Sequence, residues 1–383
     1  MSNGIDLAQL LARSSDVVRR VLDDAPRRRL QVLLTLIEPG TTTLAQPAAF
    51  RADDEYFYPA STIKTAAAYA ALLRLDELSR AGHPDLSPQT PMVFHPFPAD
   101  RSVQDRDDSN IRGGSITIAH DCRKIALVSD NPAHNRLYEF VGHREINEIT
   151  ARLVRSEPGR EMVINHRLAE PKIPLDSNRT TPRVEVRCEV PVQIPQRTSD
   201  LLLDSAHVPG VRVGREHVDP LTDERRAGPM DFSRRNRMSL RSLHTLLLTL
   251  TRPDLLPPPT TLTLRPAWRD MLLESMTILP RLSDNPRYDA REYPDHFAKY
   301  LLPGLRRRCA AADIIVTNKV GRAYGFSIEN AMITHRPSGR SIAITATIYA
   351  NAREVINDGG YEDESLSDPF MADLGEAIAR EFF

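Results

Sequence analysis

The apolar positions of the chain predict strands near both of its ends. Residues 30–37 (LQVLLTLI) form a continuous apolar run, which is typical of a buried strand, and Glu38-Pro39-Gly40 follows as a turn signal. Residues 49–52 predict a short hairpin partner for this strand. Towards the C-terminus, apolar or alternating runs predict three more strands, over residues 314–318, 326–334 and 341–349.

Helical periodicity dominates much of the rest of the chain. Residues 60–78 are rich in alanine and leucine and follow Pro59, which favours a helix. Apolar spacing predicts further helices over residues 5–21, 116–128, 135–154, 239–250 and 368–382. If the strands from both ends pair in one antiparallel sheet, the middle must fold as a separate helical lobe. A cleft then lies between the two lobes, which is a usual place for a small-molecule site.

Residues 155–237 have a different pattern. Proline, arginine and short β-type pieces, such as residues 184–186 and 190–194, replace the helical periodicity. Residues 210–231 have the composition of an exposed loop. We therefore expect an elaborated surface insertion in this part of the chain.

Together these elements predict a single domain over residues 1–383 in the α/β class, of the α+β type. An antiparallel sheet flanked by helices forms one lobe, from about residues 1–58 and 255–383. A helical lobe takes about residues 59–254 and includes the insertion. A chain of 383 residues is long enough to bury a core of this size.

Composition and charge narrow the classes of function. The net charge of −1 and the single tryptophan give no support for a nucleic-acid partner. No apolar run reaches the roughly 18 to 20 residues that span a membrane, and the first residues lack the pattern of a signal peptide. The cysteines and the clustered histidines lack the spacing of a disulfide framework or a metal site, so no metal and no other cofactor is expected. These residues are Cys122, Cys188, Cys309, His134, His143 and His166.

Lysine is rare in this chain. Of the 50 basic residues only five are lysines: Lys64, Lys124, Lys172, Lys299 and Lys319. Arginine serves for solvation almost everywhere, so a retained lysine is of interest, because lysine can lose its proton whereas arginine effectively cannot. Two of the five lysines belong to the motifs described next.

The first motif is Ser61-Thr62-Ile63-Lys64, at the start of the predicted helix. Positions i and i+3 share a helix face, so the Ser61 hydroxyl and the Lys64 amine can lie within hydrogen-bonding reach. A serine hydroxyl becomes a good nucleophile when a nearby base takes its proton. Lysine can be that base when burial or a neighbouring cation lowers its pKa. Because apolar and small residues surround Lys64, its position suits this role better than that of a solvated surface charge.

Two further motifs carry polar groups. Ser129-Asp130-Asn131 fits a helix N-cap, with Pro132 in the first turn. A serine placed across a cleft can also relay a proton, and the Asn131 amide can bind a substrate carbonyl. Lys319-Val320-Gly321 ends the predicted strand over residues 314–318. A glycine there allows a ligand to approach the backbone, and an edge strand can pair with a peptide-like substrate.

The three motifs in this order are the signature set of class A β-lactamases and penicillin-binding proteins. The segments around them also resemble that family, in its β-lactamase/transpeptidase-like fold. RADDEYFYPASTIK (residues 51–64) looks like the strand-to-nucleophile segment, VSDNPAHN (residues 128–135) like the second-motif helix start, and NKVGRAYG (residues 318–325) like the third-motif strand. The likeness covers roughly residues 25–155 and 236–383.

This resemblance implies a serine hydrolase that acts through an acyl-enzyme. Ser61 is then the acylated nucleophile, Lys64 its proton acceptor and Ser129 the proton relay. Lys319 is an electrostatic partner of Ser129 and of the substrate carboxylate. The backbone N–H groups of Ser61 and Arg322 form the oxyanion hole. The implied substrate-binding residues are Asn131, Gly321 and Arg322.

Two positions depart from the family pattern. Val320 replaces the usual threonine or serine, so a hydroxyl donor to the substrate carboxylate is lost. A hydrogen bond contributes about 0.5–1.5 kcal/mol, or about 1.5–3 kcal/mol with a charged partner, so acidic β-lactams should bind less well unless an arginine substitutes. The deacylating glutamate also lacks a clear counterpart. Glu170-Pro171 resembles the family's Glu-Pro pair, but Pro174 stands where an asparagine is expected. Glu170 is therefore a weak candidate for the deacylation base.

Three functions stay open at this point. The leading one is hydrolysis of a β-lactam or a related amide or ester. The second is a D,D-peptidase or esterase-like penicillin-binding enzyme with slow deacylation, and the third is a non-catalytic relative that uses the cleft for binding. In each case the partner is a small molecule or a peptidoglycan-like substrate. The family implies a periplasmic or secreted location, and the sequence leaves the oligomeric state open.

Overall fold

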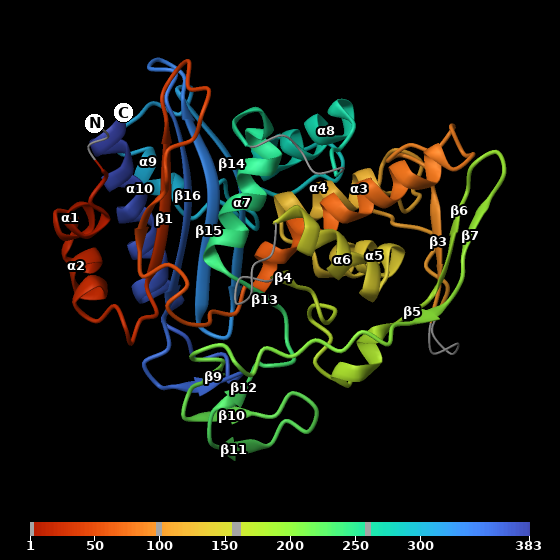
Figure 1. Cartoon of the computed structure of the whole chain (residues 1–383), viewed down its shortest axis with the longest axis horizontal. Helices are drawn as coiled ribbons and strands as arrows, with labels where there is room; N and C mark the ends of the chain where they lie inside the picture. Colours follow the sequence, from red (N-terminus) through yellow and green to blue (C-terminus); the bar gives the residue numbers. More distant parts are fainter. Residues whose placement is uncertain (1–3, 97–101, 155–161, 257–261) are drawn as a thin grey trace.

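A five-stranded antiparallel sheet with the strand order β14-β15-β16-β1-β2 lies at the centre of the protein (Figure 1). The structure is a computed structural model that describes residues 4–96, 102–154, 162–256 and 262–383. The strands are β1 (Gln31–Ile37), β2 (Ala48–Phe50), β14 (Ile314–Ala323), β15 (Phe326–His335) and β16 (Ser341–Tyr349). Because β1 is paired with β16 along its whole length, the strands from the two ends of the chain share one sheet, as predicted.

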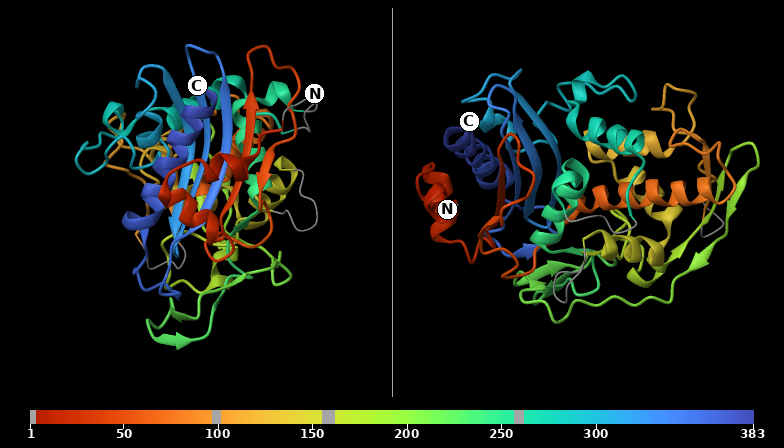
Figure 2. Two further views of the ribbon diagram at one scale, coloured as in Figure 1. Left: turned by 90° about the vertical axis from the view of Figure 1, so that its left-hand side faces the viewer. Right: turned by 45° about the horizontal axis from the view of Figure 1, so that its top comes forward.

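Both faces of this sheet are covered, because successive residues of a strand point to opposite sides. Val32 and Leu34 of β1 pack with Phe370 of the C-terminal helix α10 (Asp368–Phe382) in one core. Leu33, between them, belongs to the core shared with the helical lobe. The helices on the first face are α10, α1 (Leu7–Ala12), α2 (Asp16–Asp23) and α9 (Leu302–Leu305), as Figures 1 and 2 show.

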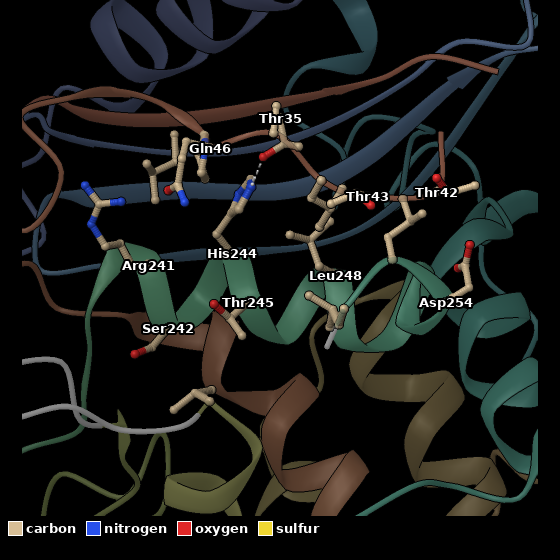
Figure 3. A pocket seen from close by; sticks show the side chains of 17 residues that line it. Thr35, Thr42, Thr43, Gln46, Arg241, Ser242, His244, Thr245, Leu248 and Asp254 are labelled. Atoms are coloured by element: carbon tan, nitrogen blue, oxygen red, sulfur yellow. Dashed lines mark hydrogen bonds between the residues drawn. The ribbon is translucent and has the colours of Figure 1, made fainter. Parts of the chain in front are cut away.

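Helix α7 (Leu240–Thr251) packs on the other face of the sheet, against β1, β15 and β16. The His244 ring of α7 contacts two neighbouring strands. Its Nε2 lies 2.9 Å from Thr35 Oγ1 of β1, and its Nδ1 lies 2.9 Å from Thr345 Oγ1 of β16. A cavity of about 610 Å³ lies beside this contact (Figure 3). Both ring nitrogens are hydrogen-bonded and burial lowers the pKa of His244 to about 4, so this side chain offers no free base to the cavity.

The helical lobe surrounds α3 (Lys64–Arg80), which is buried over most of its length. Its alanines are fully buried and small, so neighbouring helices can pack closely on it: Ala66, Ala67, Ala68, Ala70 and Ala71. Helices α4 (Ile118–Leu127), α5 (Asn131–Val141) and α6 (His143–Leu153) contact α3, and α8 (Pro266–Thr277) contacts α4 and β14. The boundaries of the two lobes along the chain stay a prediction.

Two of the predicted helices are each divided into two. The helix expected over residues 5–21 is broken into α1 and α2, because Ser15 adopts an extended conformation and its Oγ accepts a hydrogen bond from Val18 N at 3.3 Å as the N-cap of α2. The helix expected over residues 135–154 is broken between α5 and α6 at Gly142, whose φ of 92° is incompatible with a helix. Capping chemistry therefore overrides apolar periodicity at both positions.

The segment predicted as an insertion contributes short strands, as the β-type pieces over residues 184–186 and 190–194 indicated, and its residues 155–161 lie outside the described part of the chain. Strands β6 (Arg183–Val186) and β7 (Val192–Ile194) form a sheet with β3 (Met92–His95). The expectation of an exposed loop over residues 210–231 is right for residues 221–227, which are exposed, and wrong near its two ends, where buried Val213 and Met230 pair between two short strands. The strands there are β9 (Arg212–Val213), β10 (Glu216–Val218), β11 (Arg225–Ala227) and β12 (Met230–Asp231).

Of the remaining short strands, β10 connects the insertion to the sheet lobe, and the other pairs lie within the insertion or at its end. Strand β10 pairs in parallel with β17 (Val355–Ile356), beyond the central sheet. Strand β13 (Arg237–Met238) pairs with β4 (Met162–Val163), and β5 (Thr180–Thr181) pairs with β8 (Arg197–Thr198). Much of the insertion lies below the sheet and the helices in Figure 1, whereas its strands β6 and β7 lie at the right-hand edge, beside β3.

Candidate active site

Ser61 lies on a single 3₁₀ turn, η1 (Ala60–Ile63), that leads directly into α3. Ala60 has a φ of 48°, in the left-handed region that residues other than glycine seldom adopt. The carbonyl of Pro59 accepts hydrogen bonds from Thr62 N at 3.1 Å and from Thr62 Oγ1 at 2.6 Å. Strained backbone of this kind persists where the surrounding structure imposes it, and it is frequent at active sites. The predicted helix over residues 60–78 thus begins with a tight turn that presents Ser61 half-buried.

Lys64 is completely buried, and its amine reaches the second motif. Nζ is hydrogen-bonded to Ser129 O, to Ser129 Oγ at 3.2 Å and to Asn131 Oδ1 at 2.8 Å. Burial lowers the pKa of Lys64 well below its usual value, the charge of Lys319 lowers it further, and Asp130 raises it. Within the described residues no hydrogen bond joins Nζ to Ser61, so Ser129 and Asn131 are the partners that hold this lysine.

Ser129 is the point at which two lysines meet. Its Oγ lies 3.2 Å from Lys64 Nζ and 2.9 Å from Lys319 Nζ. The Ser129 backbone has a φ of 59°, again in the left-handed region. The predicted N-cap is confirmed at Asp130, whose Oδ1 accepts a hydrogen bond from Ala133 N at 2.7 Å. The cap begins α5 directly after Ser129 and so fixes where the Ser129 hydroxyl lies.

Lys319 is also buried, at 2% exposure, and a second buried group lies behind it. Its Nζ donates to Val320 O at 2.8 Å as well as to Ser129. Burial lowers the pKa of Lys319 to about 7, the Glu329 carboxylate raises it, and Lys299 lowers it. Asn318 connects these last two residues, donating to Glu329 Oε1 at 2.5 Å and accepting from Lys299 Nζ at 2.7 Å. Buried Glu329 therefore favours the charged form of Lys319.

Strand β14 carries the third motif and passes beside η1, the turn that holds Ser61. It continues to Ala323, beyond the predicted strand over residues 314–318, and it is an edge strand of the sheet, as the sequence indicated. A Cβ atom at Gly321 would lie 2.7 Å from Pro59 O and 3.0 Å from Ser61 N. Only glycine therefore allows β14 to come this close to Ser61.

Arg322 follows at the end of the motif, and its side chain is engaged within the protein. The guanidinium binds Asp368, donates to Ser327 Oγ at 3.1 Å and lies 4.6 Å from the ring centroid of Tyr300. Arg322 therefore offers little free positive charge to a ligand, and the backbone N–H role implied by the resemblance stays a prediction.

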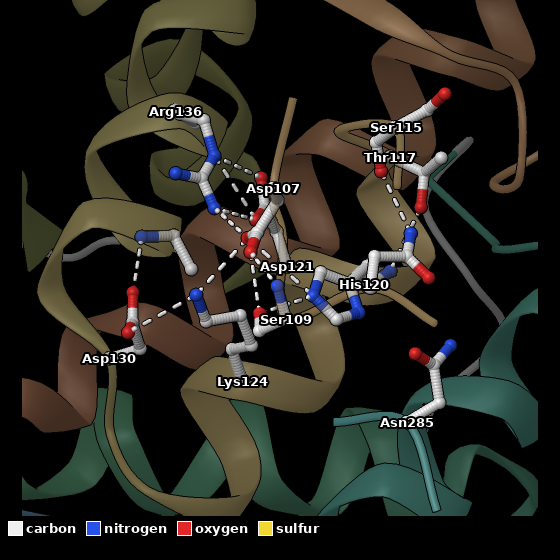
Figure 4. Close-up of polar contacts among 12 residues, drawn as sticks. Asp107, Ser109, Ser115, Thr117, His120, Asp121, Lys124, Asp130, Arg136 and Asn285 are labelled. Atoms are coloured by element: carbon white, nitrogen blue, oxygen red, sulfur yellow. Dashed lines mark hydrogen bonds and ion pairs between the residues drawn. The ribbon is translucent and has the colours of Figure 1, made fainter. Parts of the chain in front are cut away.

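A buried ionic network supports the second motif from behind (Figure 4). Lys124 Nζ lies 3.1 Å from Asp107 Oδ2 and 3.5 Å from Asp130 Oδ2, and Arg136 Nη2 lies 3.3 Å from Asp107 Oδ2. Burial alone would raise the pKa of Asp107, but the His120 and Ser109 hydrogen bonds and the Lys124 charge hold it well below its usual value. The network anchors the start of α5 to α4 and so positions Ser129.

Two cavities meet at Ser61. The larger, of about 800 Å³, is lined by Ser61 together with Ser129, Val320, Gly321 and Arg322. Its walls include aromatic and proline side chains: Phe297, Tyr300, Pro294, Pro303 and Pro369. The smaller, of about 370 Å³, is lined by Ser61 together with Asn131, Glu170 and Arg322. The structure therefore gathers the site residues predicted from the sequence around one cleft.

The weak candidate Glu170 lines the smaller cavity with Ser61, and its side chain is exposed. It makes no side-chain hydrogen bond or ion pair with any described residue. The loop that carries Glu170 is held instead through Asn135, which donates to Leu168 O at 3.0 Å and accepts from Leu168 N at 2.8 Å. Its placement is compatible with the deacylation role, which stays a prediction.

Several residues of this cleft were not predicted from the sequence to be site residues. The smaller cavity is also lined by Tyr58, His166, Arg235 and Tyr324, which are distant from one another along the chain. The ring of His166 lies stacked beside that of Tyr58, with 6.4 Å between centroids. Burial, then the charge of Arg235, lowers the pKa of His166 to about 3, so its ring is neutral.

Among the described residues, no three His, Cys, Asp or Glu side chains are grouped so that they could hold a metal ion. None of the helices in the described part of the chain is both long and apolar enough to cross a membrane.

Comparisons with known proteins bear on the fold and the family. Residues 18–188 match the model of the Beta-lactamase enzyme family. Two solved structures with TM-scores of 0.51 are a β-lactamase from Burkholderia vietnamiensis, 13% identical and covering 96% of each chain, and the β-lactamase from Streptomyces albus G, 16% identical. The latter alignment covers 96% of this chain and 99% of that chain. A search of the curated proteins found no match.

The chain therefore has the β-lactamase fold, a mixed arrangement of helices around an antiparallel sheet. The match over residues 18–188 and this fold together support the β-lactamase-like superfamily that the motifs indicated.

Proposed function

We propose that this protein is a serine hydrolase that forms an acyl-enzyme on Ser61 and hydrolyses a β-lactam or a related amide or ester. The observation that carries the proposal is the convergence of Lys64 Nζ and Lys319 Nζ on Ser129 Oγ, at 3.2 and 2.9 Å, beside Ser61 in one cavity. Surface lysines do not adopt such an arrangement, because burying two ammonium groups near each other is costly unless their protonation is adjusted.

In the proposed acylation step, Ser61 Oγ attacks the substrate carbonyl carbon while its proton passes to neutral Lys64. The lowered pKa of Lys64 is what makes it a base near neutral pH. The negative charge that develops on the carbonyl oxygen is bound by the backbone N–H groups of Ser61 and Arg322. The proton then moves from Lys64 through the Ser129 hydroxyl to the leaving nitrogen or oxygen as its bond to the carbonyl carbon breaks.

Hydrolysis of the ester on Ser61 completes the proposed cycle. A water molecule adds to the acyl carbon, its proton passes to a base, and the Ser61 hydroxyl is restored as the acid product leaves. Glu170 lines the same cavity as Ser61 and is the carboxylate placed for this role. Lys64 is the alternative base, because it is again neutral once the leaving group has been protonated.

A second function, a penicillin-binding enzyme with slow deacylation, is favoured by one observation at the larger cavity. Val320 lines it, buried, where the family usually places a hydroxyl side chain. A substrate carboxylate on that side loses a hydrogen bond worth about 1.5–3 kcal/mol. The site then suits uncharged amides or esters on its leaving-group side better than acidic β-lactams.

Intact-mass measurement after exposure to a penicillin tests the proposal. We expect an added mass equal to that of the penicillin on the wild-type protein and none on Ser61→Ala. Ser338→Ala, which removes an exposed serine from the turn after β15, is the matched control and should still form the adduct. Absence of both adduct and turnover with penicillins, cephalosporins and simple esters would contradict the proposal. A long-lived adduct supports the second function, whereas fast release supports the first.

A further inference from the structure

Arg235 is an arginine without a polar partner among the described residues, and it lies beside the candidate nucleophile. Its side chain makes no hydrogen bond or ion pair with those residues, and its Nε is buried without a hydrogen-bond partner. The neighbouring Arg234 binds Asp176, and Arg241 lies 3.1 Å from Asp53 Oδ2. Leaving a cation unpaired in a partly buried position is unfavourable, so folding stability does not explain why an arginine occupies this position.

Aromatic rings hold this guanidinium in place. Its central carbon lies 5.8 Å from the ring centroid of Phe232 and 6.0 Å from that of Tyr324. Tyr58 packs on both rings, with centroids 5.5 Å from Phe232 and 5.0 Å from Tyr324. A cation over aromatic faces is weakly stabilised but keeps its N–H groups free for another ligand. Arg235 is therefore positioned without being neutralised.

The charge of the smaller cavity is set by Arg235. Of the other arginines that line it, Arg167 lies 2.7 Å from Glu139 Oε1 and Arg322 binds Asp368. His166 is neutral at physiological pH. Glu170 is the acidic residue among those that line the cavity, and its side chain is exposed to solvent. Arg235 is therefore the cation of this cavity that no described residue pairs, with the exposed Glu170 as the other unpaired charge among its lining residues.

In the proposed reaction a substrate at Ser61 occupies both cavities, with its leaving group in one and its acyl substituent in the other. Ser129, the proposed proton relay to the leaving group, lines the larger cavity, whereas Asn131 lines the smaller one. The leaving group must therefore lie on the Ser129 side, and the substituent of the acyl group on the Asn131 side. Arg235 lines the cavity that receives this acyl substituent.

We propose that Arg235 binds a carboxylate carried by the acyl portion of the substrate, so that the enzyme prefers acyl donors with an anionic end. This rests on the proposed acylation of Ser61. A guanidinium offers a planar fork of N–H donors that matches a carboxylate in two parallel hydrogen bonds. The anion is then recognised on the acyl side of the reacting carbonyl, in a cavity of about 370 Å³ with aromatic walls.

A pair of p-nitrophenyl esters with matched acyl groups tests this inference. One carries a pentanoyl group and the other a glutaryl group, which has the same chain length but ends in a carboxylate. Release of p-nitrophenolate gives the rate constant of acylation, and intact mass confirms that the acyl group is on the protein. We expect the wild-type protein to prefer the glutaryl ester by roughly tenfold or more, the size of a charge-assisted pair of hydrogen bonds.

Three variants make the test specific. Arg235→Gln should lower the preference for the glutaryl ester to near one, and Arg235→Lys should keep part of it because the charge remains. Arg234→Gln is the matched control, since Arg234 lies next in the sequence but binds Asp176 outside this cavity, and it should keep the full preference.

The outcomes separate this inference from the proposed function. If both esters acylate Ser61 and Arg235→Gln leaves the preference unchanged, the role of Arg235 is refuted and the proposed acylation stands. If neither ester nor a penicillin labels the wild-type protein, while Ser61→Ala behaves identically, the proposed acylation itself is refuted. A preference that Arg234→Gln and Arg235→Gln lower equally would indicate a general surface-charge effect and would also overturn the inference.

Discussion

Gly321→Ala should slow the acylation of Ser61 much more than it destabilises the fold. The added methyl group would lie 2.7 Å from Pro59 O and 3.0 Å from Ser61 N. Ordinary contact begins at about 3.4 Å, so β14 or the nucleophile turn must move by roughly 0.7 Å. The backbone at Gly321 is not in the left-handed region, so the effect is one of space alone.

The rate effect follows from this displacement. A misplacement of about 1 Å between reacting groups lowers a rate by about 100-fold. For Gly321→Ala we therefore expect the rate constant of acylation to fall by roughly 10- to 100-fold. Overpacking a well-packed contact lowers the free energy of unfolding by about 1–3 kcal/mol, which leaves an ordinary domain folded.

Time-resolved intact mass with a penicillin measures the acylation, and urea unfolding measures the stability. Gly228→Ala is a suitable control, since a Cβ there meets no atom within 4 Å and its φ of 96° is unfavourable for alanine. It should lower the free energy of unfolding by about 1–3 kcal/mol and leave acylation unchanged. Should Gly321→Ala be acylated within twofold of the wild-type rate, the close approach of β14 to Ser61 is not needed for the chemistry.

Three further predictions concern charge. Acylation should rise with pH as Lys64 loses its proton and, with an anionic penicillin, fall again above about pH 7 as Lys319 loses its charge; a pH–rate profile without the alkaline decline contradicts a charged Lys319. Asp107→Asn should lower the free energy of unfolding at pH 7 by about 1–3 kcal/mol, because Lys124 loses a buried partner. Since the folded-state pKa of Asp107 is depressed, this difference should shrink as the pH falls below the usual 3.8, and urea unfolding at pH 7 and pH 3 measures it. Glu170→Gln should lengthen the lifetime of the acyl-enzyme at least about tenfold, as expected for loss of a general base, and unchanged turnover excludes that role.

The elements of the central sheet could be predicted because their signal is local. Residues 30–37 are apolar apart from Gln31 and Thr35, since β1 is buried on both faces, and β15 and β16 are likewise buried along most of their length. The antiparallel pairing of β1 with β16 joins residues about 310 positions apart, and it was inferred from the strands at both ends rather than from any pairing signal. Helix breaks at Ser15 and Gly142 were missed because apolar spacing continues across them.

The residues of the candidate site likewise differ in whether their signal in the sequence is local. Ser61, Lys64, Ser129 and Lys319 were found because each lies in a short motif. Arg235 was not, because its environment is assembled from Tyr58, Phe232 and Tyr324, which no local pattern connects.

One missed group did have a signal in the sequence. Glu329 is an acid within a strand predicted to be buried, and a buried acid requires a partner. Lys299 is one of only five lysines and is the cation bound to the same Asn318. The sequence therefore indicates that Glu329 has a partner, whereas only the structure identifies Lys299 among the five lysines.

The two lysines at Ser129 must differ in charge, and the structure decides which is charged. Lys64 and Lys319 are both buried, and two ammonium groups sharing one hydroxyl repel each other, so one of them is held neutral. Glu329 lies behind Lys319 and favours its charged form. The acid that raises the pKa of Lys64 is Asp130, but its carboxylate is already engaged with Lys124 and with the cap of α5. In the proposed mechanism Lys64 is therefore the neutral base and Lys319 the cation. Pairs of groups whose environments separate their pKa values in this way mark the acid and base of a proton transfer, and the hydroxyl of Ser129, in reach of both amines, is the group proposed to carry it.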